Sequence, residues 1–403
     1  MKKIISLIIC LLIMLNYITF TAHASVDEGT NDETTNTGNN AIGTNSLEIN
    51  AKSAVLMDAD TGLVLYTKNA SEALPPASVT KIMTLLLVAE AIDRGSISLD
   101  DKVYVSANAA SKGGSQIFIK EGEEFSVEEL LKSTVIASAN DAAVALAELL
   151  AGTEDAFVVK MNERAKSLGM TNTHFENATG LDDTVTNHLT SAYDIALMSR
   201  ELIKHDVITE YSDVWQDSIR NGEFVLTNTN RLVRYYDGCT GLKTGSTDKA
   251  GFCVSATAKR DGMHLIAVVM GAESRDERNE AARAMLDFGF SNYALYAEPE
   301  CELEYADVMG GVKDNVAVYS EKFVKLINKA DKNRIEKEYT IPESICAPLT
   351  AGDVVGRVTY KLDGEIIGES DVFVKEDVKS IGLLELYARI MKTILTGNYQ
   401  KAD

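Results

Sequence analysis

Strand-like segments at both ends of a mostly helical region place the strongest constraint on how this chain folds. Near the start, apolar runs over 54–57 and 63–66 flank the turn-forming stretch 58–62, a pattern typical of a β-hairpin. Two further strands are expected over 251–258 and 263–270. The clearest helices are expected over 79–92, 127–135, 141–150, 156–168 and 277–288. The simplest fold brings strands from both ends into one sheet that the helices cover.

The character of the sequence changes after about residue 298, where short β-rich runs such as 316–319, 338–341 and 354–360 begin. Asp363-Gly364 is a hairpin turn signal in this part. The expected parts are a signal peptide (1–24), a disordered linker (25–46), an α/β domain (47–298), a small β-rich domain (299–377) and a terminal amphipathic helix (378–403).

The first 24 residues have the pattern of a secretory signal peptide. Lys2 and Lys3 precede an apolar run over 4–20, and Ala22-His23-Ala24 supplies small residues around a cleavage site. An uncleaved membrane anchor is the alternative, because the run is close to the length that spans a bilayer. Residues 25–45 are almost free of apolar side chains, which predicts a flexible linker. The protein is therefore expected to act outside the cytoplasm, on the outer face of the membrane or beyond it.

The last helix pattern carries its apolar residues on one face. These residues are Leu383, Leu386, Tyr387, Ile390, Met391 and Ile394. One interpretation is a helix that lies in a membrane surface. The alternative is a helix that packs on the preceding domain, since its polar face carries few cations.

Charge and cysteine content narrow the possible partners. The chain has 39 Lys and Arg against 60 Asp and Glu, a formal net charge of -21, which argues against nucleic acid as the main partner. Four cysteines lie beyond the predicted cleavage site: Cys239, Cys253, Cys301 and Cys346. They form no CxxC motif and have no paired histidine, so the sequence does not predict a zinc site. Disulfides are permitted in an exported chain, but buried free thiols are the favoured interpretation.

Ser78-Val79-Thr80-Lys81 places a hydroxyl and an amine three residues apart at the expected start of a helix. Side chains at this spacing share a face, so the amine of Lys81 can reach the hydroxyl of Ser78. A serine becomes a nucleophile when a base takes its proton, and burial turns a lysine into such a base by disfavouring its charged form. Alone the motif is weak, because residues 246–249 match it too.

Two further motifs carry chemistry. Ser138-Ala139-Asn140 offers a hydroxyl for proton relay and an amide for substrate binding, although a helix cap would look the same, and residues 106–108 match the pattern as well. Lys243-Thr244-Gly245 precedes the later strand pair. Its cation and hydroxyl suit a carboxylate, and its glycine allows a substrate backbone to come close; an ordinary strand-end turn is the alternative.

Together the three motifs follow the order Ser-x-x-Lys, Ser-x-Asn, Lys-Thr-Gly, which is typical of penicillin-binding proteins and class A β-lactamases. The chain resembles a low-molecular-mass penicillin-binding protein, a serine-type D-alanyl-D-alanine carboxypeptidase of peptidase family S11. The segments 138–142, 188–194, 229–232 and 241–245 carry this resemblance, as do 250–253 and 347–356. The resemblance implies an α/β fold, with a mixed antiparallel sheet flanked by helices, followed by a small all-β domain.

The resemblance also implies roles for individual residues, with no metal and no cofactor. Ser78 would attack the carbonyl of the penultimate D-alanine of a peptidoglycan pentapeptide stem, with Lys81 as general base, and water would hydrolyse the acyl-enzyme. Ser138 would pass the proton to the leaving D-alanine, and Asn140 would orient the substrate. The terminal carboxylate would face Lys243, Thr244, Gly245, Ser246 and Arg278. β-Lactams would be covalent inhibitors.

The resemblance leaves some points open. The backbone N–H groups of Ser78 and Ser246 would form the oxyanion hole. Ala139 and Ser246 stand where relatives often have glycine and histidine, and the second difference bears on substrate preference. Arg278 would otherwise be a solvated helix charge. Rival functions are a β-lactamase, which residues 175–181 disfavour because they lack a Glu-x-x-x-Asn pattern, and a β-lactam sensor or wall-binding protein that acylates without turnover.

Overall fold

The computed structural model describes residues 47–183 and 185–396. The signal peptide and linker predicted for 1–24 and 25–46 lie outside these residues. In the region up to residue 298 the strands are β1 (Ser53–Asp58), β2 (Val64–Lys68), β3 (Lys102–Tyr104), β4 (Glu124–Ser126), β5 (Gln216–Ile219), β6 (Phe224–Thr227), β7 (Cys239–Thr247), β8 (Gly251–Arg260), β9 (Met263–Ala272) and β10 (Tyr293–Glu298).

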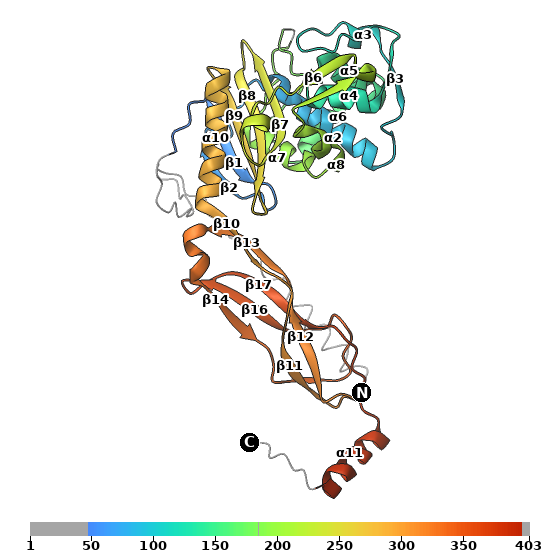
Figure 1. The fold of residues 1–403 in the computed structure, drawn as a ribbon, viewed down its shortest axis with the longest axis vertical. Helices are drawn as coiled ribbons and strands as arrows, with labels where there is room; N and C mark the ends of the chain where they lie inside the picture. The colour runs from blue at the N-terminus through green and yellow to red at the C-terminus, as the bar shows by residue number, and fades with distance from the viewer. Residues whose placement is uncertain (1–46, 184, 397–403) are drawn as a thin grey trace, which may run out of the picture. The chain divides into compact units, whose positions relative to one another are not determined.

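Helices fill the stretches between the strands (Figure 1). They are η1 (Ala77–Thr80), α2 (Lys81–Asp93), α3 (Ala107–Ala110), α4 (Val127–Val135), α5 (Asn140–Ala151), α6 (Glu154–Ser167), α7 (Ala192–Leu202), α8 (Asp206–Ser212), η2 (Arg220–Gly222), α9 (Leu232–Tyr235) and α10 (Arg275–Asn292). The predicted helix over 79–92 begins instead with a 3-10 turn, and α2 starts at Lys81. Helix α10 was predicted to begin at 277 but begins at Arg275, because the Ser274 side chain caps it by accepting from the N–H of Glu277.

A five-stranded sheet forms the centre of this region, in the order β2-β1-β9-β8-β7. Every neighbouring pair in it is antiparallel. The predicted closure is confirmed, since the hairpin from the start of the region joins the strands from its end through the β1–β9 pair.

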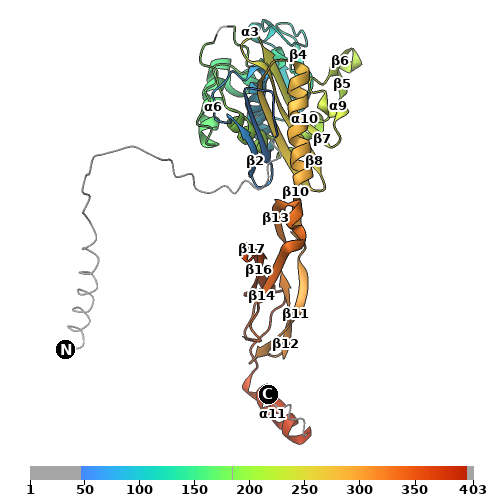
Figure 2. The ribbon, with the colours of Figure 1, turned by 90° about the vertical axis from the view of Figure 1, so that its left-hand side faces the viewer.

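Both faces of this sheet are buried, each in its own hydrophobic core. Along β1, Val55 and Met57 belong to one core, and Ala54 and Leu56 belong to the other. This alternation follows from the two-residue period of a strand. Helix α10 packs on β8 and β9 with the second core, while α2 and α7 contribute to the first (Figure 2). The sheet is thus a middle layer between helices, and its edge strand β7 contacts η1.

The region after residue 300 is β-rich, as predicted. Its elements are β11 (Cys301–Met309), β12 (Asn315–Ser320), β13 (Phe323–Asn328), η3 (Lys329–Arg334), β14 (Ile335–Thr340), β15 (Ser344–Cys346), β16 (Val354–Leu362) and β17 (Glu365–Val374). Six of these strands form one sheet in the order β14-β16-β17-β12-β11-β15, and β13 pairs with β10. Asp363-Gly364 makes the turn between β16 and β17, and Phe323 stacks on Tyr360 in the core, with ring centroids 3.8 Å apart.

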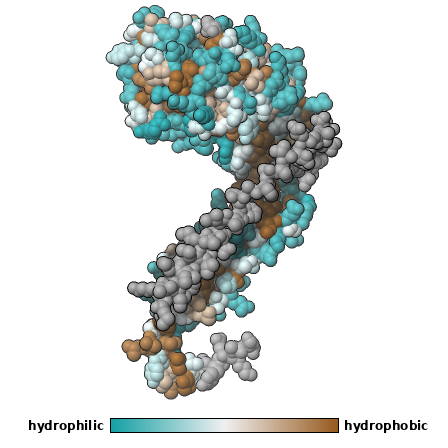
Figure 3. All heavy atoms as spheres, turned by 180° about the vertical axis from the view of Figure 1, so that it is seen from behind, coloured by the Kyte–Doolittle hydropathy of each residue, from teal (hydrophilic) through white to brown (hydrophobic). Residues whose placement is uncertain are grey.

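The last described element is α11 (Leu383–Thr396), a helix with exposed apolar side chains that Figure 3 colours brown. Within the described parts of the chain, no helix is both long enough and apolar enough to cross a bilayer. The four cysteines are free thiols. Burial is confirmed for Cys239 and Cys253 but was a wrong expectation for Cys301 and Cys346, which are exposed at the first residue of β11 and the last residue of β15.

The contact between α10 and the sheet generates a prediction. A Cβ atom added to Gly289 would lie 2.4 Å from Leu265 Cδ1 and 3.1 Å from Leu56 Cδ2. We expect Gly289→Val to lower the free energy of unfolding by about 1–3 kcal/mol, because it overpacks this interface. Glu280→Val on the exposed side of the same helix is the control and should change stability by less than about 0.5 kcal/mol in urea unfolding. Equal stability of the two variants would contradict the tight contact.

Candidate active site

The hydroxyl of Ser78 and the amine of Lys81 meet at the junction between η1 and α2. Lys81 Nζ lies 2.9 Å from Ser78 Oγ and donates a second hydrogen bond to the carbonyl oxygen of Thr179, also at 2.9 Å. The side chain of Lys81 is fully buried, with 0% of its surface exposed. The predicted contact between the Ser78 hydroxyl and the Lys81 amine is therefore present.

Burial decides the charge of this amine. It lowers the pKa of Lys81 well below the ordinary value, and the nearby charge of Lys243 lowers it further, while Asp141 acts in the opposite direction. Taking an ammonium out of water without a close carboxylate is costly, so the neutral amine is favoured. A neutral lysine accepts a proton, which is what a serine nucleophile requires.

The Ser138 motif lies on the bend that leads into α5. Ser138 has a φ of 62°, a left-handed conformation that is uncommon outside glycine and that points to local constraint. The buried carboxylate of Asp141 fixes the adjacent chain by accepting from the backbone N–H groups of Ile117 and Ile119. Asn140 donates to the carbonyl oxygen of Gly113 at 2.6 Å, whereas its own Oδ1 is buried without a hydrogen-bond partner among the described residues.

The Lys243 motif lies on β7, which runs past the start of η1. A Cβ atom on Gly245 would lie 2.7 Å from the backbone nitrogen of Ser78, so only glycine allows this approach. The Lys243 side chain is 1% exposed, and burial together with the charge of Arg278 lowers its pKa to about 7. Thr244 donates its hydroxyl proton to the hydroxyl oxygen of Thr229 at 2.8 Å.

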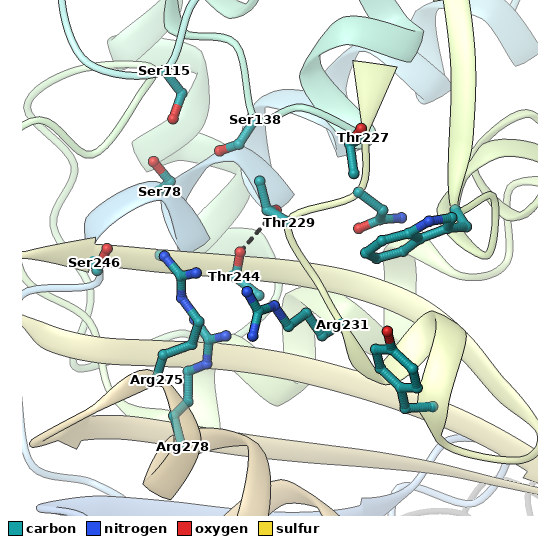
Figure 4. A pocket seen from close by; sticks show the side chains of 14 residues that line it. Ser78, Ser115, Ser138, Thr227, Thr229, Arg231, Thr244, Ser246, Arg275 and Arg278 are labelled. Carbon is teal, nitrogen blue, oxygen red and sulfur yellow. Dashed lines mark hydrogen bonds between the residues drawn. The ribbon is translucent and has the colours of Figure 1, made fainter. Parts of the chain in front are cut away.

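These elements enclose a cleft with a volume of about 620 Å³ (Figure 4). Of the nine residues predicted from the sequence, six line it: Ser78, Ser138, Thr244, Gly245, Ser246 and Arg278. The other three, Lys81, Asn140 and Lys243, are buried behind the wall. Residues from four separate stretches of sequence therefore converge on one cavity.

The competing matches to the motifs fall elsewhere. Ser106 caps α3 by accepting from the N–H of Ala109 and donates to Glu148. Lys249 donates to the carbonyl oxygen of Asp182, so it does not act on Ser246. Neither Ser106 nor Lys249 lines the cleft. Tertiary contacts thus select one copy of each motif.

Some cleft residues were given no role from the sequence, although Thr229 and Arg231 lie in a segment that carries the resemblance. They are Ser115, Trp215, Thr227, Asn228, Thr229, Arg231, Tyr235 and Arg275. Ser115 comes from a loop and Trp215 from a stretch just before β5, and neither belongs to a motif. Arg275 lies three residues before Arg278 in the first turn of α10, a spacing that brings two side chains to one helix face and was available as a signal.

His188 ties a neighbouring loop to the helix that carries the nucleophile. Its Nδ1 accepts from the N–H of Glu176 at 2.9 Å, so the ring proton is on Nε2, which donates to the hydroxyl oxygen of Thr80 at 2.8 Å. Gly180, in the same loop, packs so tightly that an added Cβ would lie 1.8 Å from the carbonyl oxygen of Ala77. The loop thereby holds the Thr179 carbonyl that accepts from Lys81.

The fold and this cleft, in which a serine hydroxyl contacts a buried lysine, define a class of protein: the serine hydrolases. A family model described as D-alanyl-D-alanine carboxypeptidase matches residues 39–274, and one described as the C-terminal domain of penicillin-binding protein 5 matches residues 290–380. The chain belongs to the D-alanyl-D-alanine carboxypeptidase family, and it is a serine hydrolase of that family.

Individual relatives agree with this assignment. The D-alanyl-D-alanine carboxypeptidase DacF of Bacillus subtilis is 46% identical over 86% of this chain and 91% of its own length. The structure of penicillin-binding protein 5 from Haemophilus influenzae is 30% identical, covers 84% of this chain and 100% of that one, and has a TM-score of 0.68. Penicillin-binding protein D2 of Listeria monocytogenes, solved in an ampicillin-bound form, is 33% identical over 60% of this chain and 99% of its own, with a TM-score of 0.56.

The histidine contact predicts a pH dependence of stability. Burial lowers the pKa of His188 from 6.5 to about 4, against opposing effects of Glu176 and Asp182, while His174 adds to the shift. Between pH 6.5 and 4 the unfolded chain binds a proton that the folded chain excludes, so this histidine lowers stability by about 3 kcal/mol as the pH falls through that window.

We expect His188→Gln to flatten that part of the curve of unfolding free energy against pH. Glutamine offers an acceptor to Glu176 and a donor to Thr80 but does not titrate in this range. His174→Gln, which removes an exposed histidine from the same region, is the control and should keep most of the native slope, because burial is the larger cause of the His188 shift. A native slope in His188→Gln as well would contradict the prediction.

Proposed function

We propose that this enzyme removes the terminal D-alanine from the pentapeptide stems of peptidoglycan through an acyl-enzyme on Ser78. The observation that carries the proposal is the 2.9 Å contact between Ser78 Oγ and the fully buried amine of Lys81. The neutral amine takes the hydroxyl proton while Oγ attacks the carbonyl carbon of the penultimate D-alanine. Two backbone N–H groups, those of Ser78 and Ser246, stabilise the oxyanion, and the close approach of Gly245 to Ser78 supports this pairing.

The collapse of the tetrahedral intermediate breaks the amide bond. In the proposed mechanism Ser138 passes a proton to the leaving nitrogen, and the free Oδ1 of Asn140 accepts an N–H of the substrate. The terminal carboxylate lies against the Thr244 hydroxyl and the Arg278 guanidinium, and the charge of Lys243 acts from behind the wall of the cleft. Water then hydrolyses the ester and returns the proton to the Ser78 oxygen. No step in this sequence requires a metal or a cofactor.

β-Lactams are the proposed covalent inhibitors of the same serine, and the ampicillin-bound form of the Listeria relative supports this. A β-lactamase function is disfavoured by the placement of Glu176. Its carboxylate accepts from the backbone N–H groups of Thr186 and Asn187, and it does not line the cleft. Glu176 is therefore not placed to activate a water molecule that would hydrolyse the acyl-enzyme rapidly, as a β-lactamase requires.

The test is D-alanine release from a pentapeptide, followed by mass spectrometry with and without penicillin. We expect the native enzyme to release D-alanine, and Ser78→Ala to lose both this activity, by at least about a thousandfold, and the covalent penicillin adduct. Ser246→Ala is the matched control and should keep a detectable adduct, because only its backbone is proposed to act. An adduct in Ser78→Ala would refute the nucleophile, and a stable adduct without any D-alanine release would identify a β-lactam sensor.

We propose further that the protein is exported by its first 24 residues and acts outside the cytoplasm, held at the membrane surface by α11. The apolar side chains of this helix that are exposed include Leu383, Leu384, Tyr387 and Leu395. Arg389, on the polar face, contacts Asp314 and the carbonyl oxygen of Val312 in the β-rich region. Because these apolar side chains of α11 stay exposed, the helix is better suited to a membrane surface than to packing on the β-rich domain.

Truncation tests this anchoring. We expect the mature protein without the residues after Ser380 to move from the membrane pellet to the soluble fraction, with D-alanine release unchanged. Full-length protein with Leu386→Asp and Ile394→Asp should be released as well, because both changes place a charge on the apolar face, whereas Glu385→Gln should remain bound. A truncated form that still sediments with membranes would contradict anchoring by this helix.

A further inference from the structure

Three arginines crowd the end of the cleft where the leaving group would lie. Arg275 and Arg278 come from the first turn of α10, and Arg231 lies directly before α9. All three line the cleft together with Thr244. Figure 4 shows their guanidinium groups next to one another beside Thr244, on the side of the cleft away from Ser115. Elements far apart in the sequence thus deliver three permanent positive charges to one place.

No carboxylate neutralises this cluster within the described ranges 47–183 and 185–396. None of the three guanidinium groups forms an ion pair with an Asp or Glu there. The side chain of Arg278 donates only to the amide oxygen of Asn279. Burial lowers the pKa of Arg278, and the charges of Arg275 and Arg231 lower it further, while Cys253 and Asp276 act in the opposite direction. The net effect lowers the pKa of Arg278 to about 10.

The proposed reaction accounts for only part of this charge. One terminal carboxylate beside Thr244 would be balanced by Lys243 and Arg278, which leaves the other two arginines without a role in the proposed reaction. Arg231 and Arg275 line the same cleft, and neither pairs with a carboxylate among the described residues. Like charges in a partly dry cleft repel one another, and an arginine fork suits a carboxylate in particular. The arrangement has room and charge for a second anion close to the first.

We propose that Arg231 and Arg275 form a second anion subsite, which binds the side-chain carboxylate of an acidic D-amino acid in the terminal position of the substrate. The inference rests on the proposed carboxypeptidase function and concerns the leaving group of that reaction. The chemistry is unchanged: Ser78 Oγ forms the ester, the amide bond between D-alanine and the acidic residue breaks, and the proton from Oγ goes to the departing amine. Its α-carboxylate occupies the place beside Thr244, and its second carboxylate lies between Arg231 and Arg275.

Peptides that differ in one group isolate this interaction. We would measure kcat/KM for stem peptides that end in D-Ala-D-Glu, D-Ala-D-Gln and D-Ala-D-Ala. D-Glutamate and D-glutamine have the same length and shape, so their ratio reports the charge. The native enzyme should prefer the D-glutamate peptide over the D-glutamine peptide by at least about tenfold, since charged hydrogen bonds discriminate strongly. Added salt should lower the preference, because the subsite opens to solvent.

Variants assign the preference to the two arginines. In the double variant Arg231→Gln with Arg275→Gln, the D-glutamate to D-glutamine ratio should fall to about one, while Arg231→Lys with Arg275→Lys should keep part of it. Arg283→Gln removes an exposed arginine of α10 outside the cleft and should keep the native ratio. Penicillin labelling of each variant reports a folded active site.

The outcomes separate the subsite from the underlying function. D-Alanine release from the D-Ala-D-Ala peptide with a native D-glutamate to D-glutamine ratio near one would overturn the subsite and leave the carboxypeptidase function intact. A native preference that survives in the double glutamine variant would overturn the assignment to Arg231 and Arg275. Failure of the native enzyme to release any terminal residue from the three peptides would overturn the proposed function itself.

Discussion

The burial of one amine is the constraint on which the active site depends. Lys81 has no exposed surface, and its amine donates hydrogen bonds to Ser78 Oγ and to the carbonyl oxygen of Thr179. In water this amine would be protonated and useless as a base. The hydrophobic core around α2 and the loop that carries Thr179 remove that water, so stability and chemistry share the same packing.

The central sheet brings the remaining groups to this amine. Because β7 passes against η1 at Gly245, the backbone of Ser246 and the side chain of Thr244 reach the nucleophile without a flexible connection. On the other side, Asp141 fixes the chain after Ser138 through backbone N–H groups of the 117–119 segment. The cleft is therefore built by rigid elements that meet, which is the condition for transition-state stabilisation without reorganisation.

Positive charge divides the cleft into two functional ends. The charge of Lys243 disfavours a proton on Lys81, and the charge of Arg278 in turn lowers the pKa of Lys243. In the proposed function the arginines attract the carboxylate end of the substrate, although the chain as a whole has a net charge of -21. The cleft is thus positive although the chain is negative, because a few cations inside the cleft outweigh the solvent-screened acids on the surface.

The sequence alone determined the hairpin, the strand pair from 251 onward, the main helices and the three motifs, because periodicity and residue spacing are local properties. Only the order of the three motifs singled out Ser78 and Ser138 from the matches at 246 and 106. The sequence did not point to Ser115, and it assigned no role to Arg231 or His188, although both lie in segments that carry the resemblance. Those depend on which segments touch, and burial and contact between distant segments exist only in the folded chain. Tertiary structure therefore decided which lysine loses its charge and which arginines share one wall.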